Sequence, residues 1–225
     1  MCPGVKMDVG TALVATQMKP MYLPAVENNT ELRGGWAEMI GCLKAAAMPV
    51  PQMFYLLAFK PEITQHLERF AHGVMRGPSP LSPGFRELIA AFTGSINGCA
   101  PCRDCHAAVA AGLLDDDLKT AAVLEDFRSA PISEEEKLLF AFIELVNGLG
   151  AQEGDFAVLR EAGWSDEALY DAITVCALAN LLCRWADGAG VSEAPLEVQR
   201  LCVRRLIEQG YLLSTGEPCH RKPAP

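Results

Sequence analysis

The chain has 225 residues and a formal net charge of −9; half of its residues are apolar and about a fifth are charged. This length is enough for one sizeable domain or two small ones, and the composition is typical of a soluble globular protein. The acidic balance argues against a nucleic-acid partner, because a surface that binds a duplex needs clustered lysine and arginine.

No run of about eighteen apolar residues predicts a transmembrane helix, and the N-terminal segment lacks the pattern of a secretory signal. We therefore expect a cytoplasmic protein without a membrane partner. In the cytoplasm, most of the nine cysteines are expected to be reduced thiols. A local cluster of cysteines then indicates redox or metal chemistry rather than structural disulfides.

The hydrophobic spacing is helical along nearly the whole chain, and no stretch shows a convincing strand alternation, which predicts an all-α fold. After about thirty irregular residues, a helix is expected over roughly 31–47. A second helix follows Pro51 and a third starts at Pro61. Four apolar side chains lie on one face of this third helix: Ile63, Leu67, Phe70 and Val74.

Capping residues predict where the later helices begin. In chain order the caps are Ser82, the acidic run 115–117, Ser133 with Glu136 as a capping box, and Ser165 before a long buried helix. A last helix is expected over about 194–209, ending at Gly210 and followed by a mobile tail.

The segment SINGCAPCRDCHAA, residues 95–108, carries most of the chemical information. Cys99 and Cys102 have the CxxC spacing of a redox dithiol, whereas Cys102, Cys105 and His106 spell the CxxCH signature of c-type haem attachment. All four side chains together could also bind zinc. The ligands of such a zinc site would be unusually close in sequence, and haem attachment fits poorly with the missing export signal. We therefore favour the dithiol.

Proline explains why the dithiol would be reactive. Pro101 is tolerated only in the first turn of a helix, so the helix must begin close to residues 99–101. Cys102 then lies in the first turn, where free N–H groups and the helix dipole favour a thiolate. His106 lies one turn further on the same face and could act as base or proton shuttle.

The pattern Glu87, Cys99-x-x-Cys102-x-x-x-His106 resembles the alkylhydroperoxidase D and carboxymuconolactone decarboxylase-like family, in particular its peroxidase-related branch. The segments FKPEITQHLERFAHGVMRGPSPLSPGFREL, AGWSD and ANLLCR are also similar to that family. The resemblance spans roughly residues 40–192. It leaves residues 1–39 as a partly irregular N-terminal extension and residues 193–225 as a C-terminal helix and tail.

The resemblance implies an all-helical fold that forms homo-oligomers and reduces organic hydroperoxides without a cofactor or metal. Cys102 would be the attacking thiolate and Cys99 the resolving thiol that closes the disulfide. His106 and Glu87 would form the proton relay. A thiol or dithiol partner would reduce the disulfide and complete the cycle.

Two departures from the family keep other functions open. Pro101 replaces a histidine of the family's relay, and it makes the motif CAPC similar to thioredoxin-type dithiols. Cys105 could compete for the disulfide or act as an extra resolving thiol. The alternatives are a thiol–disulfide exchange protein without peroxidase activity, a decarboxylase that does not need the thiols, and a zinc- or ligand-binding helical module.

The remaining polar and aromatic candidates are expected to be structural. Cys176 and Cys183 are seven residues apart on one helical face, which suits burial. Asn180 and Arg184 are one turn apart and could pair with an acidic group or another subunit. The three tryptophans, Trp36, Trp164 and Trp185, are expected in a core or an interface.

Overall fold

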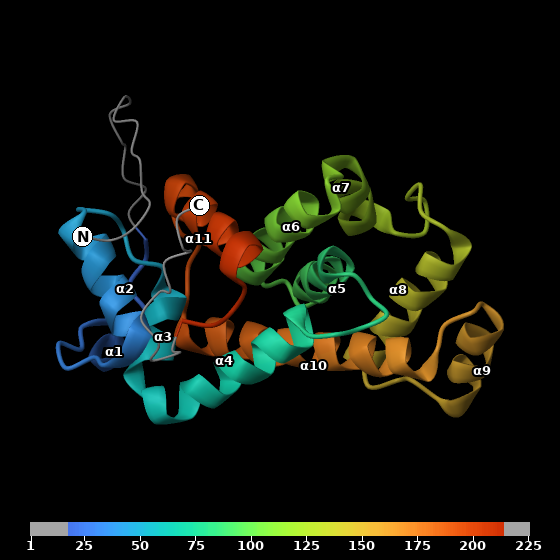
Figure 1. The fold of residues 1–225 in the computed structure, drawn as a ribbon, viewed down its shortest axis with the longest axis horizontal. Helices are drawn as coiled ribbons and strands as arrows, with labels where there is room; N and C mark the ends of the chain where they lie inside the picture. Colours follow the sequence, from blue (N-terminus) through green and yellow to red (C-terminus); the bar gives the residue numbers. More distant parts are fainter. Residues whose placement is uncertain (1–17, 214–225) are drawn as a thin grey trace, which may run out of the picture.

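The computed structural model describes residues 18–213, which fold into helices with no strand in that range, so the predicted all-α class is confirmed (Figure 1). The helices are α1 (Pro24–Glu27), α2 (Gly34–Ala45), α3 (Gln52–Phe59), α4 (Pro61–Arg76), α5 (Pro83–Ile96), α6 (Ala100–Leu114), α7 (Asp117–Asp126), α8 (Glu134–Asn147), α9 (Glu153–Glu161), α10 (Asp166–Ala189) and α11 (Leu196–Gln209).

The predicted capping residues begin the helices as expected. Ser82 accepts a hydrogen bond from the backbone N–H of the third residue after it at the start of α5, and Ser165 does the same at α10. Ser133 and Glu136 form the complete capping box of α8. Asp116 of the acidic run caps α7 by accepting from the N–H of Lys119. These caps satisfy backbone donors that the first helical turn leaves free.

The main core lies around α5, which is buried along almost its whole length. α5 packs against α6 and α10, and α8 closes the core from a further side. Aromatic rings fill the centre, where Phe92 contacts Phe140 edge to face at 5.1 Å and Phe85 lies 5.6 Å from Phe140. Because α5 and α6 are consecutive and tightly packed, the residues at their junction are held rigidly.

A second apolar cluster joins the N-terminal helices to the end of α10. Trp36 and Ile40 of α2 pack with Phe54 of α3, and Ala189 of α10 belongs to the same cluster. α11 then lies along α6, on the side of the molecule where α2 and α3 lie (Figure 1). Helices α2 and α3 from the first part of the chain and helix α11 from its last part therefore come together next to the start of α6.

The expected apolar face of α4 is only partly buried. Ile63 is 61% exposed and Phe70 is 51% exposed, whereas Leu67 and Val74 pack against the main core. α4 instead buries a neighbouring face that contains Glu68, whose carboxylate accepts a hydrogen bond from Trp36 Nε1 at 2.5 Å. Apolar periodicity cannot find a face that is held by a buried polar contact, so the sequence pattern did not indicate this second face.

Among residues 18–213, α10 is long and apolar enough to cross a membrane by length and composition alone. It contains no strictly apolar run of that length, so the apolar-run criterion did not predict it. α10 contacts α4, α5, α6 and α8 and contributes many of its side chains to the main core. Its apolar character is therefore explained by its place in the centre of the fold.

Core packing predicts a large difference between two leucines. Leu139 in α8 is fully buried, whereas Leu118 in α7 is 83% exposed. Leu139→Ala should lower the free energy of unfolding by about 2–5 kcal/mol, because it leaves a cavity in a close-packed core. Leu118→Ala should change it by less than about 0.5 kcal/mol. Denaturant unfolding of both variants checks this, and equal losses would contradict the core assignment.

Candidate functional site

The junction of α5 and α6 positions the cysteine segment. α5 ends at Asn97, and Gly98 adopts a left-handed φ of +65° that turns the chain back toward α5. Cys99 is the N-cap of α6, as the position of Pro101 predicted. A Cβ on Gly94 would lie 2.8 Å from the backbone nitrogen of Arg103, so only glycine allows this close approach of the two helices.

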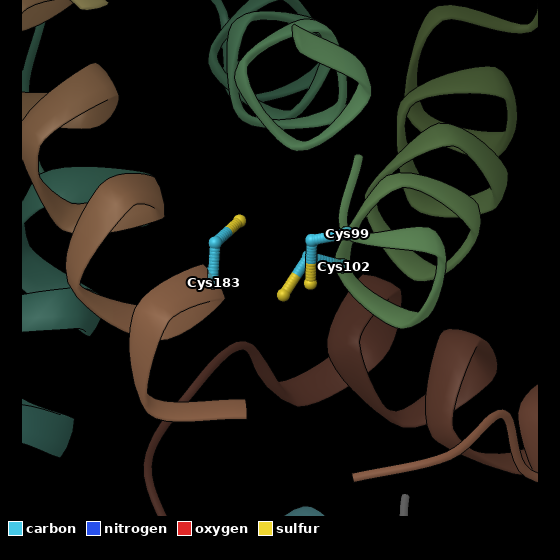
Figure 2. A group of neighbouring side chains, drawn as sticks. All are labelled: Cys99, Cys102 and Cys183. Atoms are coloured by element: carbon cyan, nitrogen blue, oxygen red, sulfur yellow. The ribbon is translucent and has the colours of Figure 1, made fainter. Parts of the chain in front are cut away.

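Three thiols from two helices meet at this junction (Figure 2). Cys99 and Cys102 lie at the start of α6, and Cys183 lies in α10. Their three sulfur atoms are all within 4.8 Å of one another. Cys99 and Cys183 are buried and Cys102 is half-buried. All three are free thiols. The sequence analysis expected Cys183 to be buried, which is correct, but missed its place beside the dithiol.

The three thiols strongly influence one another's ionisation. Hydrogen bonds with Cys102 and Cys183 lower the pKa of Cys99 far below the usual range of a thiol. Hydrogen bonds with Cys183 and Cys99, together with burial, raise the pKa of Cys102. The group therefore holds its first negative charge at Cys99, the N-cap residue. The expectation that the helix start would favour a thiolate at Cys102 is not met while all three thiols are reduced.

A buried carboxylate and a histidine lie on the neighbouring turns of the same two helices. His106 Nδ1 of α6 lies 2.6 Å from Glu87 Oε2 of α5, and Glu87 is fully buried. Burial alone would raise the pKa of Glu87, but the hydrogen bond and charge of His106 and the charge of Arg76 outweigh it and lower the pKa. Glu87 is therefore a carboxylate that orients the imidazole ring.

Two further residues hold this carboxylate, and the sequence analysis missed both. Arg76 Nη2 at the end of α4 lies 2.7 Å from Glu87 Oε1. The hydroxyl of Tyr211 donates to the same oxygen at 2.8 Å and lies 3.4 Å from His106 Nδ1. Burial and the charge of Glu87 raise the pKa of Tyr211 well above its usual value, so Tyr211 is a neutral donor.

The position of Tyr211 corrects the prediction of a mobile tail directly after α11. Gly210 ends α11 with a φ of +71°, and a Cβ at this position would lie 2.9 Å from His72 Nδ1. The chain therefore turns tightly against α4 and carries Tyr211 to Glu87. A glycine followed by an aromatic residue was the only sequence signal, and it is the ordinary pattern of a helix end. The rest of the expected tail, residues 214–225, lies outside the described residues.

Cys105 is not part of the thiol group. Burial raises its pKa to about 12, so it is a poor nucleophile. The metal-ligand group that the structure brings together contains Cys183 in place of the Cys105 and His106 expected for zinc. Three thiols at this spacing match the soft ligand set that Cu(I) and Zn(II) prefer.

A cavity of about 210 Å³ opens onto Cys102 and His106. Residues of α2, α3, α4, α10 and α11 line it together with the start of α6. Most of its lining is apolar, with Trp36, Phe54 and Leu57 among the lining residues. The half-buried thiol and the imidazole thus share one space that a small organic molecule can enter.

The Asn180 and Arg184 pair has a structural role that differs from the expected one. Arg184 Nη1 donates to Asn180 Oδ1 within α10, so the two residues pair with each other. Asn180 also accepts from Asn97 at 3.2 Å and donates to Asn147 at 2.7 Å. These amides connect the α5–α6 turn to α10 and α8, and they help hold Cys183 opposite the dithiol. Trp36 and Trp185 lie in the N-terminal apolar cluster, and Trp164 packs on the main core.

The central helices match the model of a known protein family. Residues 61–135 match the model of the carboxymuconolactone decarboxylase family. This range includes Arg76, Glu87, both cysteines of the CxxC motif and His106, but not Cys183 or Tyr211. No curated protein matches the sequence.

Solved structures resemble a larger part of the chain. An uncharacterized peroxidase-related protein from Silicibacter sp. is 25% identical with a TM-score of 0.63, over 72% of this chain and 85% of that one. An uncharacterized peroxidase-related protein from Ralstonia eutropha, described as an alkylhydroperoxidase AhpD core, is 25% identical with a TM-score of 0.62, over 75% and 88%. A protein of unknown function from Agrobacterium tumefaciens shares the fold at 23% identity, with a TM-score of 0.53 over 62% and 96%.

The contacts within the thiol group predict how Cys99 ionises. Cys183→Ala removes one hydrogen-bond donor and should raise the pKa of Cys99, whereas Cys183→Ser keeps a donor and should raise it less. The lowered pKa stabilises the fold above the ordinary thiol pKa, and this contribution is lost as the pH falls through the lowered value. Titration of the thiolate absorbance in the ultraviolet measures the shift. Cys176→Ala, another buried cysteine of α10, is the control and should leave the titration unchanged.

Proposed function

We propose that this chain, which belongs to the carboxymuconolactone decarboxylase family and has an AhpD-like fold, is a thiol-dependent reductase of organic hydroperoxides. The observation that carries the proposal is the meeting of a reactive thiol group with a Glu87–His106 pair at one apolar cavity. The peroxidase-related descriptions of two solved relatives agree with it. Reduced thiols fit best in a reducing compartment such as the cytoplasm.

In the first step, the sulfur of Cys102 attacks the terminal oxygen of the hydroperoxide. His106, oriented by Glu87, takes the proton of the Cys102 thiol. The O–O bond breaks, Cys102 becomes a sulfenic acid and the organic part leaves as an alkoxide. His106 returns the proton to the alkoxide.

In the second step, the Cys99 thiolate attacks the sulfur of the sulfenic acid. A disulfide forms between Cys99 and Cys102, and the hydroxide that leaves takes a proton from the solvent to become water. The protein has then given two electrons to the peroxide. An external thiol or dithiol returns them by disulfide exchange and restores both thiols.

These roles predict different outcomes for the two cysteines. Cys102→Ser should reduce the turnover of cumene hydroperoxide to the uncatalysed background, because serine cannot form the sulfenic acid. Cys99→Ser should stop turnover after one event and leave a sulfenic acid on Cys102 that dimedone traps. Cys176→Ala should retain turnover. Undiminished turnover by Cys102→Ser would disprove the proposal, and dimedone labelling of Cys99 in that variant would reverse the two roles.

The close group of three thiols favours a second candidate function, a metal site. Cys99, Cys102 and Cys183 could bind a soft d10 ion such as Zn(II) or Cu(I) as thiolates. Stoichiometric zinc in protein purified without added metal, lost in Cys183→Ala and retained in Cys176→Ala, would establish this function.

A dithiol exchange protein would instead act on disulfides and ignore hydroperoxides, and a decarboxylase would act on a muconolactone without either thiol.

We also propose that the chain forms a homo-oligomer, as its resemblance to the family implies. Ile63 and Phe70 leave a large apolar part of α4 exposed, which an identical subunit could cover. Phe70→Asp should then lower the assembly mass measured by light scattering, because burying an unpaired carboxylate is costly. Leu118→Asp, on an exposed position of α7, should leave the mass unchanged. A monomeric wild-type chain would contradict this proposal.

A further inference from the structure

The walls of the cavity lie mostly outside the segment that matches the family model. α2, α3 and α11 line it, whereas the match covers residues 61–135. Helix α6, inside the matched segment, supplies Cys102 and His106. Helices α2, α3 and α11, outside it, shape much of the space in which a ligand would lie. The volume of about 210 Å³ exceeds the roughly 150 Å³ of an apolar protein cavity that binds benzene, so a substituted aromatic ring can be accommodated.

One charged side chain that lines this cavity forms no hydrogen bond or close ion pair within residues 18–213. Arg205 of α11 packs its guanidinium 5.3 Å from the ring of Trp36. Its Nε and Nη1 atoms are buried and donate no hydrogen bond within residues 18–213. Burial lowers the pKa of Arg205, which reflects the cost of holding its charge here.

The other buried arginines differ from Arg205. Arg76 and Arg86 also leave Nε without a partner, but each donates through its terminal nitrogens. Arg76 pairs with Glu87, and Arg86 Nη1 donates to a backbone carbonyl at 2.7 Å. Arg205 differs because its guanidinium packs on the face of Trp36 and Glu68 acts on it through charge without a hydrogen bond.

The acidic residues of the cavity have other contacts. Glu68 accepts from Trp36 Nε1 at 2.5 Å, and its charge raises the pKa of Arg205 against the effect of burial. Asp104 pairs with Arg103 at 2.6 Å, and Glu193 also interacts with Arg103. A buried guanidinium with free donors beside an apolar wall is the arrangement that receives a carboxylate attached to an apolar body.

We propose that the cavity selects organic hydroperoxides that carry a carboxylate. The carboxylate pairs with Arg205, the apolar body lies against Trp36, Phe54 and Leu57, and the hydroperoxide group reaches Cys102 and His106. The selection of an anion concerns binding alone, whereas the reaction of the bound peroxide rests on the proposed reductase function. Oxidised fatty acids and aromatic acids belong to this class of substrate.

Binding can be tested without any redox chemistry. 4-Isopropylbenzoate and isopropylbenzene differ only in the carboxylate, and calorimetry or Trp fluorescence measures their binding to the reduced chain. The benzoate should bind at least about tenfold more tightly to the wild type. Arg205→Gln should remove this preference while leaving the affinity for isopropylbenzene within about threefold, and Arg205→Lys should retain part of it. Equal binding of the two probes to the wild type would overturn the proposal even if no variant folds.

Turnover provides the second test. Cumene hydroperoxide and its para-carboxylate should differ by about tenfold in kcat/KM for the wild type, with the difference lost in Arg205→Gln. A merely structural role of Arg205 would slow both substrates equally and overturn the proposal. If the benzoate binds as expected but neither peroxide oxidises Cys102, the reductase function fails and the anion site stands. If both peroxides react equally and the benzoate does not bind, the reductase function stands and the anion site fails.

Discussion

The fully buried carboxylate of Glu87 is the constraint on which the rest of the site depends. A carboxylate removed from water costs several kcal/mol unless charged and hydrogen-bonding partners surround it. Arg76 from α4, His106 from α6 and Tyr211 after α11 all contact it. The two helices that flank α5 in the sequence and the distant segment after α11 must therefore meet at one point of α5. The same contacts fix which ring nitrogen of His106 faces the protein interior.

The thiol group and the cavity follow from that arrangement. Because α6 is held against α5 at Gly94 and at His106, its first turn presents Cys99 and Cys102 to α10, where Cys183 lies opposite. Tyr211 draws the end of α11 over the site, and α11 in turn supplies Arg205 and one wall of the cavity. The buried carboxylate of Glu87 thus connects the reactive residues of α6 with the cavity wall that α11 supplies.

Local rules predicted much of the fold and half of the site. Ser133, Ser165 and Pro101 mark helix starts because caps and proline act within a few residues of themselves. Cys183, Arg76 and Tyr211 were missed because each reaches the site by tertiary packing, and none stands in a motif. The buried face of α4 that contains Glu68 was missed for a related reason, since a buried polar contact such as that between Glu68 and Trp36 leaves no trace in apolar periodicity.

The most direct measurement is a count of thiols by mass spectrometry after alkylation, before and after one equivalent of cumene hydroperoxide, with metal analysed on the same sample. The account predicts the loss of two thiols, a Cys99–Cys102 linkage and no stoichiometric metal. A Cys102–Cys183 linkage would make Cys183 the resolving thiol in place of Cys99. Unchanged thiols with bound zinc would contradict the account, and the three cysteines would then form a metal site on an AhpD-like fold.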